Sequence, residues 1–142
     1  MVCRDIEDEL LPYCKANDIG VICYSPMQKG LLSGAFSKER MERLALDDVR
    51  HLDEDFKGRR FEINLELIEQ LKEIAQQSGM TVAQLAISWI LKADGVTAAI
   101  VGARKKGQIA ETVKAADITL PNDSIEQIEE LLAQRNTKIS DL

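Results

Sequence analysis

Apolar residues recur at intervals of three and four along much of the chain, and this spacing predicts helices. The four clearest stretches cover residues 6–17, 64–78, 81–94 and 123–132. Thr81 begins the third stretch, and Gln84 follows at the third helical position, which is the pattern of a capping box. Asn64 and Asp123 are suitable N-caps for the second and fourth stretches. Pro12 either kinks the first helix or lies in the first turn of a shorter one. Shorter helices are expected over residues 38–46 and 109–116.

Two short segments are apolar without interruption and predict strands over Val21–Tyr24 and Thr97–Val101. Uninterrupted apolar strands are typical of parallel sheets that are covered on both faces. The helices between them predict a right-handed crossover and therefore an α/β fold, in one unit over residues 1–142. Two strands cannot bury each other, so we expect the chain to be part of a larger sheet.

Composition agrees with a single ordinary globular domain, because 45% of the 142 residues are apolar and 30% are charged. The 24 acidic and 18 basic residues give a formal net charge of −6, which argues against nucleic acid or a membrane surface as partner. No apolar run approaches a membrane span and no signal peptide is recognisable, so we expect a cytoplasmic protein. The three cysteines lack C-x-x-C spacing and indicate neither a disulfide framework nor a zinc site.

Candidate chemistry begins where the first predicted strand ends, because parallel sheets bind ligands at the carboxyl ends of their strands. The sequence there is Y-S-P-M-Q-K-G-L-L-S-G, from Tyr24 to Gly34, and it opens a mostly irregular segment that reaches about residue 60. An exposed aromatic ring at a strand end stacks on planar ligands, and glycines let backbone N–H groups turn toward an anion. A purely structural turn explains the same residues.

The second predicted strand ends in I-V-G-A-R-K-K-G-Q, from Ile100 to Gln108. Three consecutive cations, Arg104 to Lys106, precede a predicted helix in an otherwise acidic protein. Such a turn suits a phosphate group, because the helix dipole and the free N–H groups of its first turn add to the positive charge. The alternative is a basic turn that only contacts water.

Taken together, these segments resemble the aldo-keto reductase family. Tyr24 to Gly34 is similar to the family pattern Y-S-P-L-x-x-G-L-L-T-G, and Ile100 to Thr112 is similar to I-P-G-A-R-x-P-x-Q-(x)2-E-N. Thr81 to Trp89, T-V-A-Q-L-A-I-S-W, is similar to T-P-A-Q-L-A-L-A-W. The three motifs occur in the family order and spacing, and the resemblance runs from about Arg4 to Leu132.

The resemblance implies a fold and an activity. The family fold is a (β/α)8 TIM barrel, of which this chain would be a C-terminal fragment that supplies the last two parallel strands and the surrounding helices. The complete family member is an NADP(H)-dependent oxidoreductase that reduces a carbonyl to an alcohol by hydride transfer. The family's catalytic Tyr, Asp, Lys and His lie in the earlier part of the barrel. No catalytic residue is therefore expected among these residues, and whether the chain alone is an enzyme stays open.

The resemblance also implies which residues contact NADP(H). They are Tyr24, Ser25, Met27, Gly30, Leu31, Gly102, Ala103, Arg104, Gln108, Glu111 and Thr112. Tyr24 would stack on the nicotinamide, and the backbone from Ser25 to Leu31 would surround the pyrophosphate. Gly102 to Arg104 would lie near the 2′-phosphate, which a guanidinium binds well, and the last three residues would lie around the adenine. Thr112 stands where the family pattern has Asn, so one bidentate amide contact is lost.

Other conspicuous side chains have structural explanations at this stage. Tyr13 and Trp89 are expected in the core, and His51 is expected to be structural or solvated. Lys29 and Lys38 are expected to face water, and the acidic run at residues 47–55 is expected to be a solvated loop without a metal. Two other functions remain open, a non-catalytic nucleotide-binding module and a self-assembling module whose partner is either a second copy or the missing barrel portion.

Overall fold

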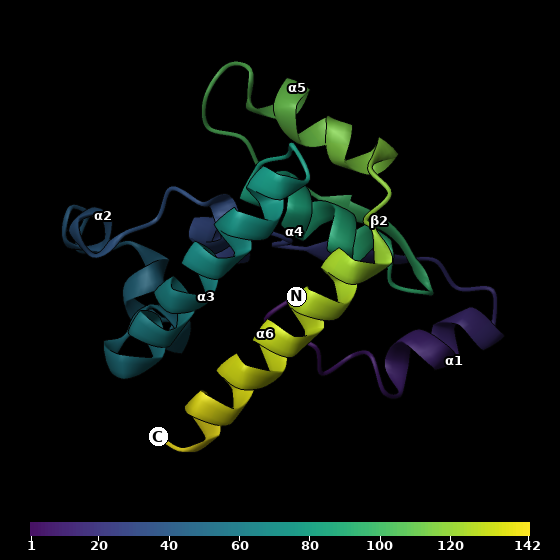
Figure 1. The fold of residues 1–142 in the computed structure, drawn as a ribbon, viewed down its shortest axis with the longest axis horizontal. Coiled ribbons are helices and arrows are strands. Elements are labelled where there is room, and N and C mark those ends of the chain that lie inside the picture. The colour runs from purple at the N-terminus through teal and green to yellow at the C-terminus, as the bar shows by residue number, and fades with distance from the viewer.

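Two parallel strands lie side by side, and helices pack against one face of this sheet (Figure 1). The computed structural model describes residues 1–142. The elements are α1 Leu10–Ala16, β1 Val21–Tyr24, α2 Lys38–Glu42, α3 Gly58–Gln77, α4 Val82–Leu91, β2 Val96–Ile100, α5 Gln108–Thr112 and α6 Asn122–Ser140. Short 3₁₀ turns are η1 Gln28–Ser33, η2 Val49–Leu52, η3 Glu54–Phe56 and η4 Val113–Asp117. No helix has both the length and the apolar character needed to cross a membrane.

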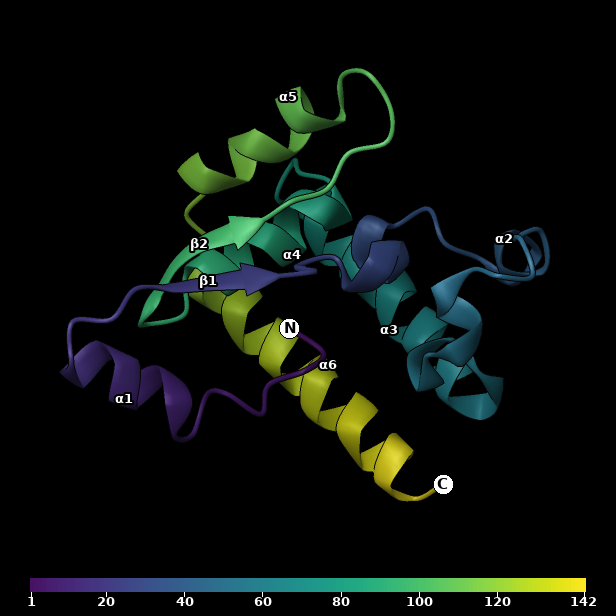
Figure 2. The same ribbon diagram turned by 180° about the vertical axis from the view of Figure 1, so that it is seen from behind.

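The sheet brings the two candidate segments next to each other. Val21 pairs with Val96 and Tyr24 pairs with Ile100, so both strands end at the same edge. In Figure 2 the two strand arrows point the same way, and the chain leaves each arrowhead toward η1 and α5 respectively. The crossover between the strands carries α3 and α4, which confirms the predicted α/β arrangement.

One face of the sheet is uncovered. Burial alternates along β1, so that Ile22 is 62% exposed and Tyr24 is 82% exposed, while Cys23 packs against the core. Ile100, the partner of Tyr24, is 54% exposed on the same face. These 142 residues therefore cover only one of the two apolar faces, as expected if two strands cannot bury themselves.

The core lies between α3, α4 and α6 and extends under η1. Leu71, Leu85 and Ile128, one from each helix, are fully buried. Leu31 and Leu32, which follow the first strand, enter the same core, and burial of each such side chain contributes about 1.5–3 kcal/mol. These two leucines thus anchor the turn after β1 to the core.

Two predicted helices have other bounds in the structure. Asn64 is not the N-cap of α3, because the helix begins six residues earlier at Gly58 and Asn64 is 1% exposed in its interior. Asp123 does not cap α6, which starts at Asn122 after Pro121 and continues to Ser140 rather than stopping at residue 132. Each helix carries a buried polar side chain that an apolar stripe does not reveal, Asn64 in α3 and Arg135 in α6.

Local signals were reliable at the start of α4, whereas the helix predicted over residues 38–46 ends at Glu42. Thr81 and Gln84 form the predicted capping box at the start of α4. Pro12 lies in the first turn of a helix shorter than the predicted one, and Trp89 is buried as predicted. Tyr13, which was expected in the core, is 62% exposed instead. It lies on α1, a seven-residue helix that buries only two of its side chains.

Candidate functional site

The first candidate segment leaves β1 at Tyr24 and turns sharply. The Tyr24 ring is almost entirely exposed at the strand end. Ser25, Gln28 and Lys29 have positive φ angles of 50°, 42° and 52°, which are unfavourable for residues with a side chain. Gly30 follows at φ 95°, which glycine adopts without strain because it has no side chain. A run of strained residues persists only where surrounding contacts hold it.

The backbone of this turn leaves N–H groups unused. The Gly30 and Leu32 N–H groups both donate to the Met27 carbonyl, at 3.0 and 3.1 Å. The N–H groups of Met27 and Lys29 make no hydrogen bond. Free donors near a sharp, glycine-containing turn form the kind of concavity that binds an anion.

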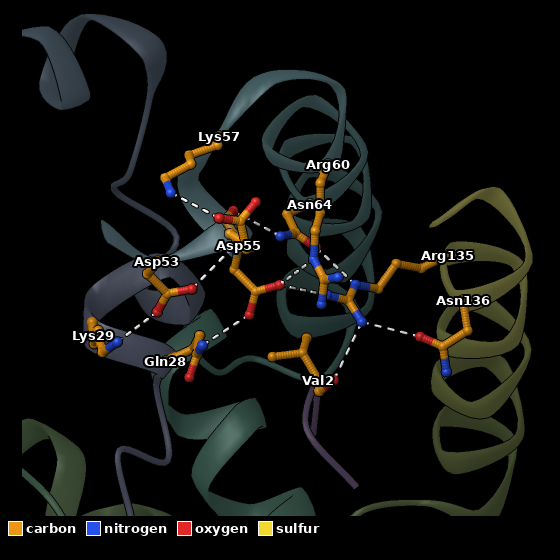
Figure 3. Close-up of polar contacts among 11 residues, drawn as sticks. Val2, Gln28, Lys29, Asp53, Asp55, Lys57, Arg60, Asn64, Arg135 and Asn136 are labelled. Atoms are coloured by element: carbon orange, nitrogen blue, oxygen red, sulfur yellow. Dashed lines mark hydrogen bonds and ion pairs between the residues drawn. The ribbon is translucent and has the colours of Figure 1, made fainter. Parts of the chain in front are cut away.

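Two side chains tie the turn to the acidic segment. Gln28 Nε2 donates to Asp55 Oδ2 at 2.8 Å, and Lys29 Nζ lies 2.5 Å from Asp53 Oδ2 (Figure 3). Burial raises the pKa of Asp53, but the hydrogen bonds from Lys29 and from the Asp55 N–H outweigh it and hold the pKa below its usual value. The sequence predicted that Lys29 faces water, but in the structure Lys29 forms an ion pair with Asp53.

Asp55 is 3% exposed, which contradicts the predicted solvated loop. Its Oδ1 accepts from Arg60 Nε at 2.8 Å and from Arg135 Nη2 at 3.1 Å, and its carbonyl accepts from Asn64 Nδ2 at 2.9 Å. Arg135 Nε donates in turn to Asn64 Oδ1 at 2.7 Å. We call Gln28, Asp55, Arg60, Asn64 and Arg135 the Asp55 network (Figure 3). It joins the turn after β1 to α3 and α6.

The second candidate segment leaves β2 at Ile100 as an exposed turn. All residues from Gly102 to Gly107 are exposed. The side chains of Arg104, Lys105 and Lys106 form no ion pair, although most other basic residues of the chain do. The N–H groups of Gly102 and Ala103 also lack a hydrogen bond. Unpaired cations beside free N–H donors suit a phosphate.

Gln108 shapes this turn. Its Oε1 accepts from the N–H groups of both Arg104 and Lys105, at 2.7 and 2.8 Å. These two donors are therefore occupied. The helix that follows, α5, is only five residues long, so its dipole contributes less than the longer predicted helix would.

The residues expected around an adenine differ in accessibility. Glu111 is exposed, and its carbonyl accepts from Gln84 Nε2 at 2.9 Å. Thr112 is buried, and its hydroxyl donates to the Gln108 carbonyl at 2.9 Å. Ile109 and Val113 are both exposed, and the helix predicted over residues 109–116 is divided into α5 and the tighter η4.

A buried arginine forms an ion pair within the long segment after β1. Arg50, buried in η2 with its guanidinium 5.4 Å from the centre of the Phe36 ring, binds Asp48 through two hydrogen bonds from its side chain. The Arg50 guanidinium holds the pKa of the Asp48 carboxyl well below its usual range, and the charge of Arg104 lowers it further.

Of the two principal hollows on the surface, one touches the candidate site. A mostly apolar hollow of about 430 Å³ lies beside β1 and includes Tyr24, Ser25 and Gln28 in its wall. A larger one, of about 630 Å³, lies among Arg4, Lys15 and other residues and contains no predicted site residue.

The other polar residues singled out in the sequence are structural. His51 Nε2 lies 3.0 Å from the Ala45 carbonyl, and Lys38 pairs with Glu62 rather than only with water. No three His, Cys, Asp or Glu side chains lie in an arrangement that could hold a metal ion.

The geometry thus brings two phosphate-compatible turns to one edge of a parallel sheet, and comparison with known proteins identifies the family. The family model described as "Aldo/keto reductase family" matches residues 1–133. The chain belongs to the aldo/keto reductase family.

Several aldo/keto reductase relatives are similar over most of this chain. Aldo-keto reductase YhdN from Bacillus subtilis (strain 168) is 34% identical over 130 residues, which cover 91% of this chain and 39% of that protein. L-glyceraldehyde 3-phosphate reductase from Escherichia coli (strain K12) is 35% identical over 130 residues, which cover 87% of this chain and 36% of that protein. A probable voltage-gated potassium channel subunit beta from Arabidopsis thaliana is 33% identical over 133 residues, which cover 87% of this chain and 39% of that protein.

A solved aldo/keto reductase structure has the same arrangement of elements. The glycerol dehydrogenase AKR11B4 from Gluconobacter oxydans superposes with a TM-score of 0.85 at 28% identity, covering 94% of this chain and 40% of that protein. The chain therefore spans about two fifths of the length of the relatives it matches.

Proposed function

We propose that this chain is the part of an NADP(H)-dependent aldo-keto reductase that holds the cofactor, and that it forms the C-terminal portion of the (β/α)8 barrel. Members of the family typically use NADP(H). The observation that carries the proposal is the pairing of Tyr24 with Ile100, since it joins two anion-compatible turns at the carboxyl edge of one sheet.

The described residues fit the chemical parts of NADP(H). The free N–H groups of Met27 and Lys29 suit the pyrophosphate, and the exposed ring of Tyr24 suits stacking on the nicotinamide. The unpaired guanidinium of Arg104 suits the 2′-phosphate that distinguishes NADP(H) from NAD(H). Ser25, Gly30 and Leu31 shape the first turn, and Gly102, Ala103 and Gln108 shape the second. Of the residues expected near the adenine, Glu111 is accessible and Thr112 is not.

The bound cofactor supplies a hydride that reduces a carbonyl to an alcohol in a complete family member. The role of these residues is to bind and orient it, with the cations neutralising its phosphates. Because the 142 residues contain none of the family's catalytic side chains in their motif context, we expect them to bind NADPH without reducing a generic aldehyde. Steady NADPH consumption by the purified chain with an aldehyde would contradict this assignment.

Cofactor preference tests the proposal at a single residue. Nicotinamide fluorescence titrations should give tighter binding for NADPH than for NADH. Arg104→Met should remove that difference, weakening NADPH by about 10- to 100-fold, the effect of losing a hydrogen bond between charged groups. Lys114→Met is the matched control, because Lys114 is also exposed and unpaired but lies beyond α5. Equal loss in both variants, or equal affinity for the two cofactors, would count against the proposal.

The uncovered sheet face favours a second candidate, self-association. Ile22, Tyr24 and Ile100 present exposed apolar area beside an open strand edge, which invites pairing with another copy or with the rest of a barrel. Light scattering tests it: a stable, well-folded monomer at high concentration would rule out self-association of the chain.

A further inference from the structure

The turn after β1 is held in its strained shape from outside. Gln28 and Lys29, two consecutive residues with positive φ, each bind one residue of the acidic segment, Asp55 and Asp53. Asp53 Oδ1 also accepts from the Asp55 N–H at 2.9 Å and caps η3. Asp53 and Asp55, the two anchors of the turn, are therefore joined to each other. Without these contacts the turn would relax toward negative φ.

Of the two anchors, only Asp55 is fixed in the protein interior. Lys29 reaches Asp53 near the surface, where its side chain is substantially exposed and contributes little. The Asp55 carboxylate is buried and receives Arg60 from α3, Arg135 from α6 and Gln28 from the turn. Figure 3 shows Gln28 and the two arginines converging on this carboxylate from different elements. A hydrogen bond to a charged, buried and immobilised acceptor is stronger than one between neutral groups.

The position of Gln28 matters because of its neighbours. It lies between Met27 and Lys29, whose N–H groups are the free donors of the turn. Rotation about the φ and ψ bonds of Gln28 therefore changes the position of these two donors relative to each other. We propose that Asp55 is a positioning residue for cofactor binding, which acts through Gln28 to hold the Met27 and Lys29 N–H groups ready for the pyrophosphate. This inference rests on the proposed function.

Charge reversal and rescue test the inference. Gln28→Glu sets two carboxylates against each other where the 2.8 Å hydrogen bond now lies. In the double variant Gln28→Glu/Asp55→Asn, the new amide donates to the new carboxylate, which restores the bond with reversed polarity. Gln70→Glu is the matched control, because Gln70 is exposed on α3 and its side chain makes no hydrogen bond. All variants are made in the full-length protein that the gene encodes.

Two readouts are compared, the NADPH dissociation constant from fluorescence titration and hydrogen exchange of residues 25–33 without cofactor. Gln28→Glu should weaken NADPH binding by at least about tenfold, the effect of losing one hydrogen bond to a charged group, and should accelerate exchange of residues 25–33. The double variant should return both readouts to the values of Asp55→Asn alone, and Gln70→Glu should match the wild type. If Asp55→Asn fails to fold, Gln28→Ala replaces the cycle, because it leaves Asp55 with both arginines.

The outcomes separate the inference from the proposed function. If the wild type binds NADPH and Gln28→Glu binds it as tightly as Gln70→Glu does, the positioning role is refuted and the proposed function stands. The same holds if the double variant shows no rescue, since a merely structural role predicts additive losses. If the wild type does not bind NADPH, the proposed function fails and the inference fails with it.

Discussion

Replacing Arg135 with alanine removes the centre of the buried polar contacts between α3 and α6. The Arg135 side chain is 4% exposed and donates to Asn64 Oδ1, Asp55 Oδ1 and the Val2 carbonyl, at 2.7, 3.1 and 3.2 Å. Breaking a buried ion pair from one side typically costs about 3–5 kcal/mol, because the remaining charge is left without a partner. Here Asp55 keeps Arg60 and Gln28, which reduces the penalty. The Asn64 oxygen, however, loses its partner in the core, at about 1–3 kcal/mol.

We therefore expect Arg135→Ala to lower the free energy of unfolding by about 3 kcal/mol. Urea unfolding followed by circular dichroism measures this change. Lys138→Ala is the control on the same helix, because Lys138 forms an exposed ion pair with Glu66 that contributes less than about 1 kcal/mol. A loss for Arg135→Ala below about 1 kcal/mol, or equal to that of the control, would refute the view that this arginine is part of the core.

Two further predictions concern a turn and acid stability. Gly34 has φ 74°, and a Cβ there would lie 3.1 Å from Val82 Cγ2, so Gly34→Ala should cost about 1–3 kcal/mol in urea unfolding. Wild-type stability in that variant would show that the turn adapts. The pKa values of Asp53, Glu62 and Glu66 all lie below their usual values, so these carboxylates stabilise the folded state only while ionised. The free energy of unfolding should therefore fall as the pH drops below about 4, near the pKa of unfolded carboxyls. A free energy of unfolding that stays constant as the pH falls from about 4 to about 2 would contradict those ion pairs.

The parts of the fold that were predictable are those set by local signals. The apolar runs at residues 21–24 and 97–101 marked both strands to within one residue, because short apolar runs bounded by turn residues are typical of strands in a parallel sheet. The capping box at Thr81 marked the start of α4 for a similar reason, since both partners lie within one turn. The sequence motifs at the two strand ends likewise pointed to the edge where the structure brings them together.

The parts that were not predictable depend on contacts between residues far apart in sequence. Asn64 was interpreted as a helix cap because its side chain usually competes with the helical backbone, but here it binds Asp55 and Arg135 instead. Arg135 follows Leu132 by three residues and Ile128 by seven, so it continues the buried stripe of α6 as a charged residue. A charged residue at the spacing of the buried apolar residues is therefore the signal that could have identified Arg135 as buried. Its partner Asp55, 80 residues away, has no such signal.

The central claim is that NADP(H) binds across the two strand-end turns. Backbone amide NMR of the 15.8 kDa chain during an NADPH titration tests it most directly. We predict that the largest chemical-shift changes fall on the amides of Met27, Lys29, Gly102 and Ala103. NADH should shift the amides of Gly102 and Ala103 less than NADPH does. Absence of shift changes at saturating NADPH, or changes centred on the hollow beside Lys15 and Arg4, would contradict it.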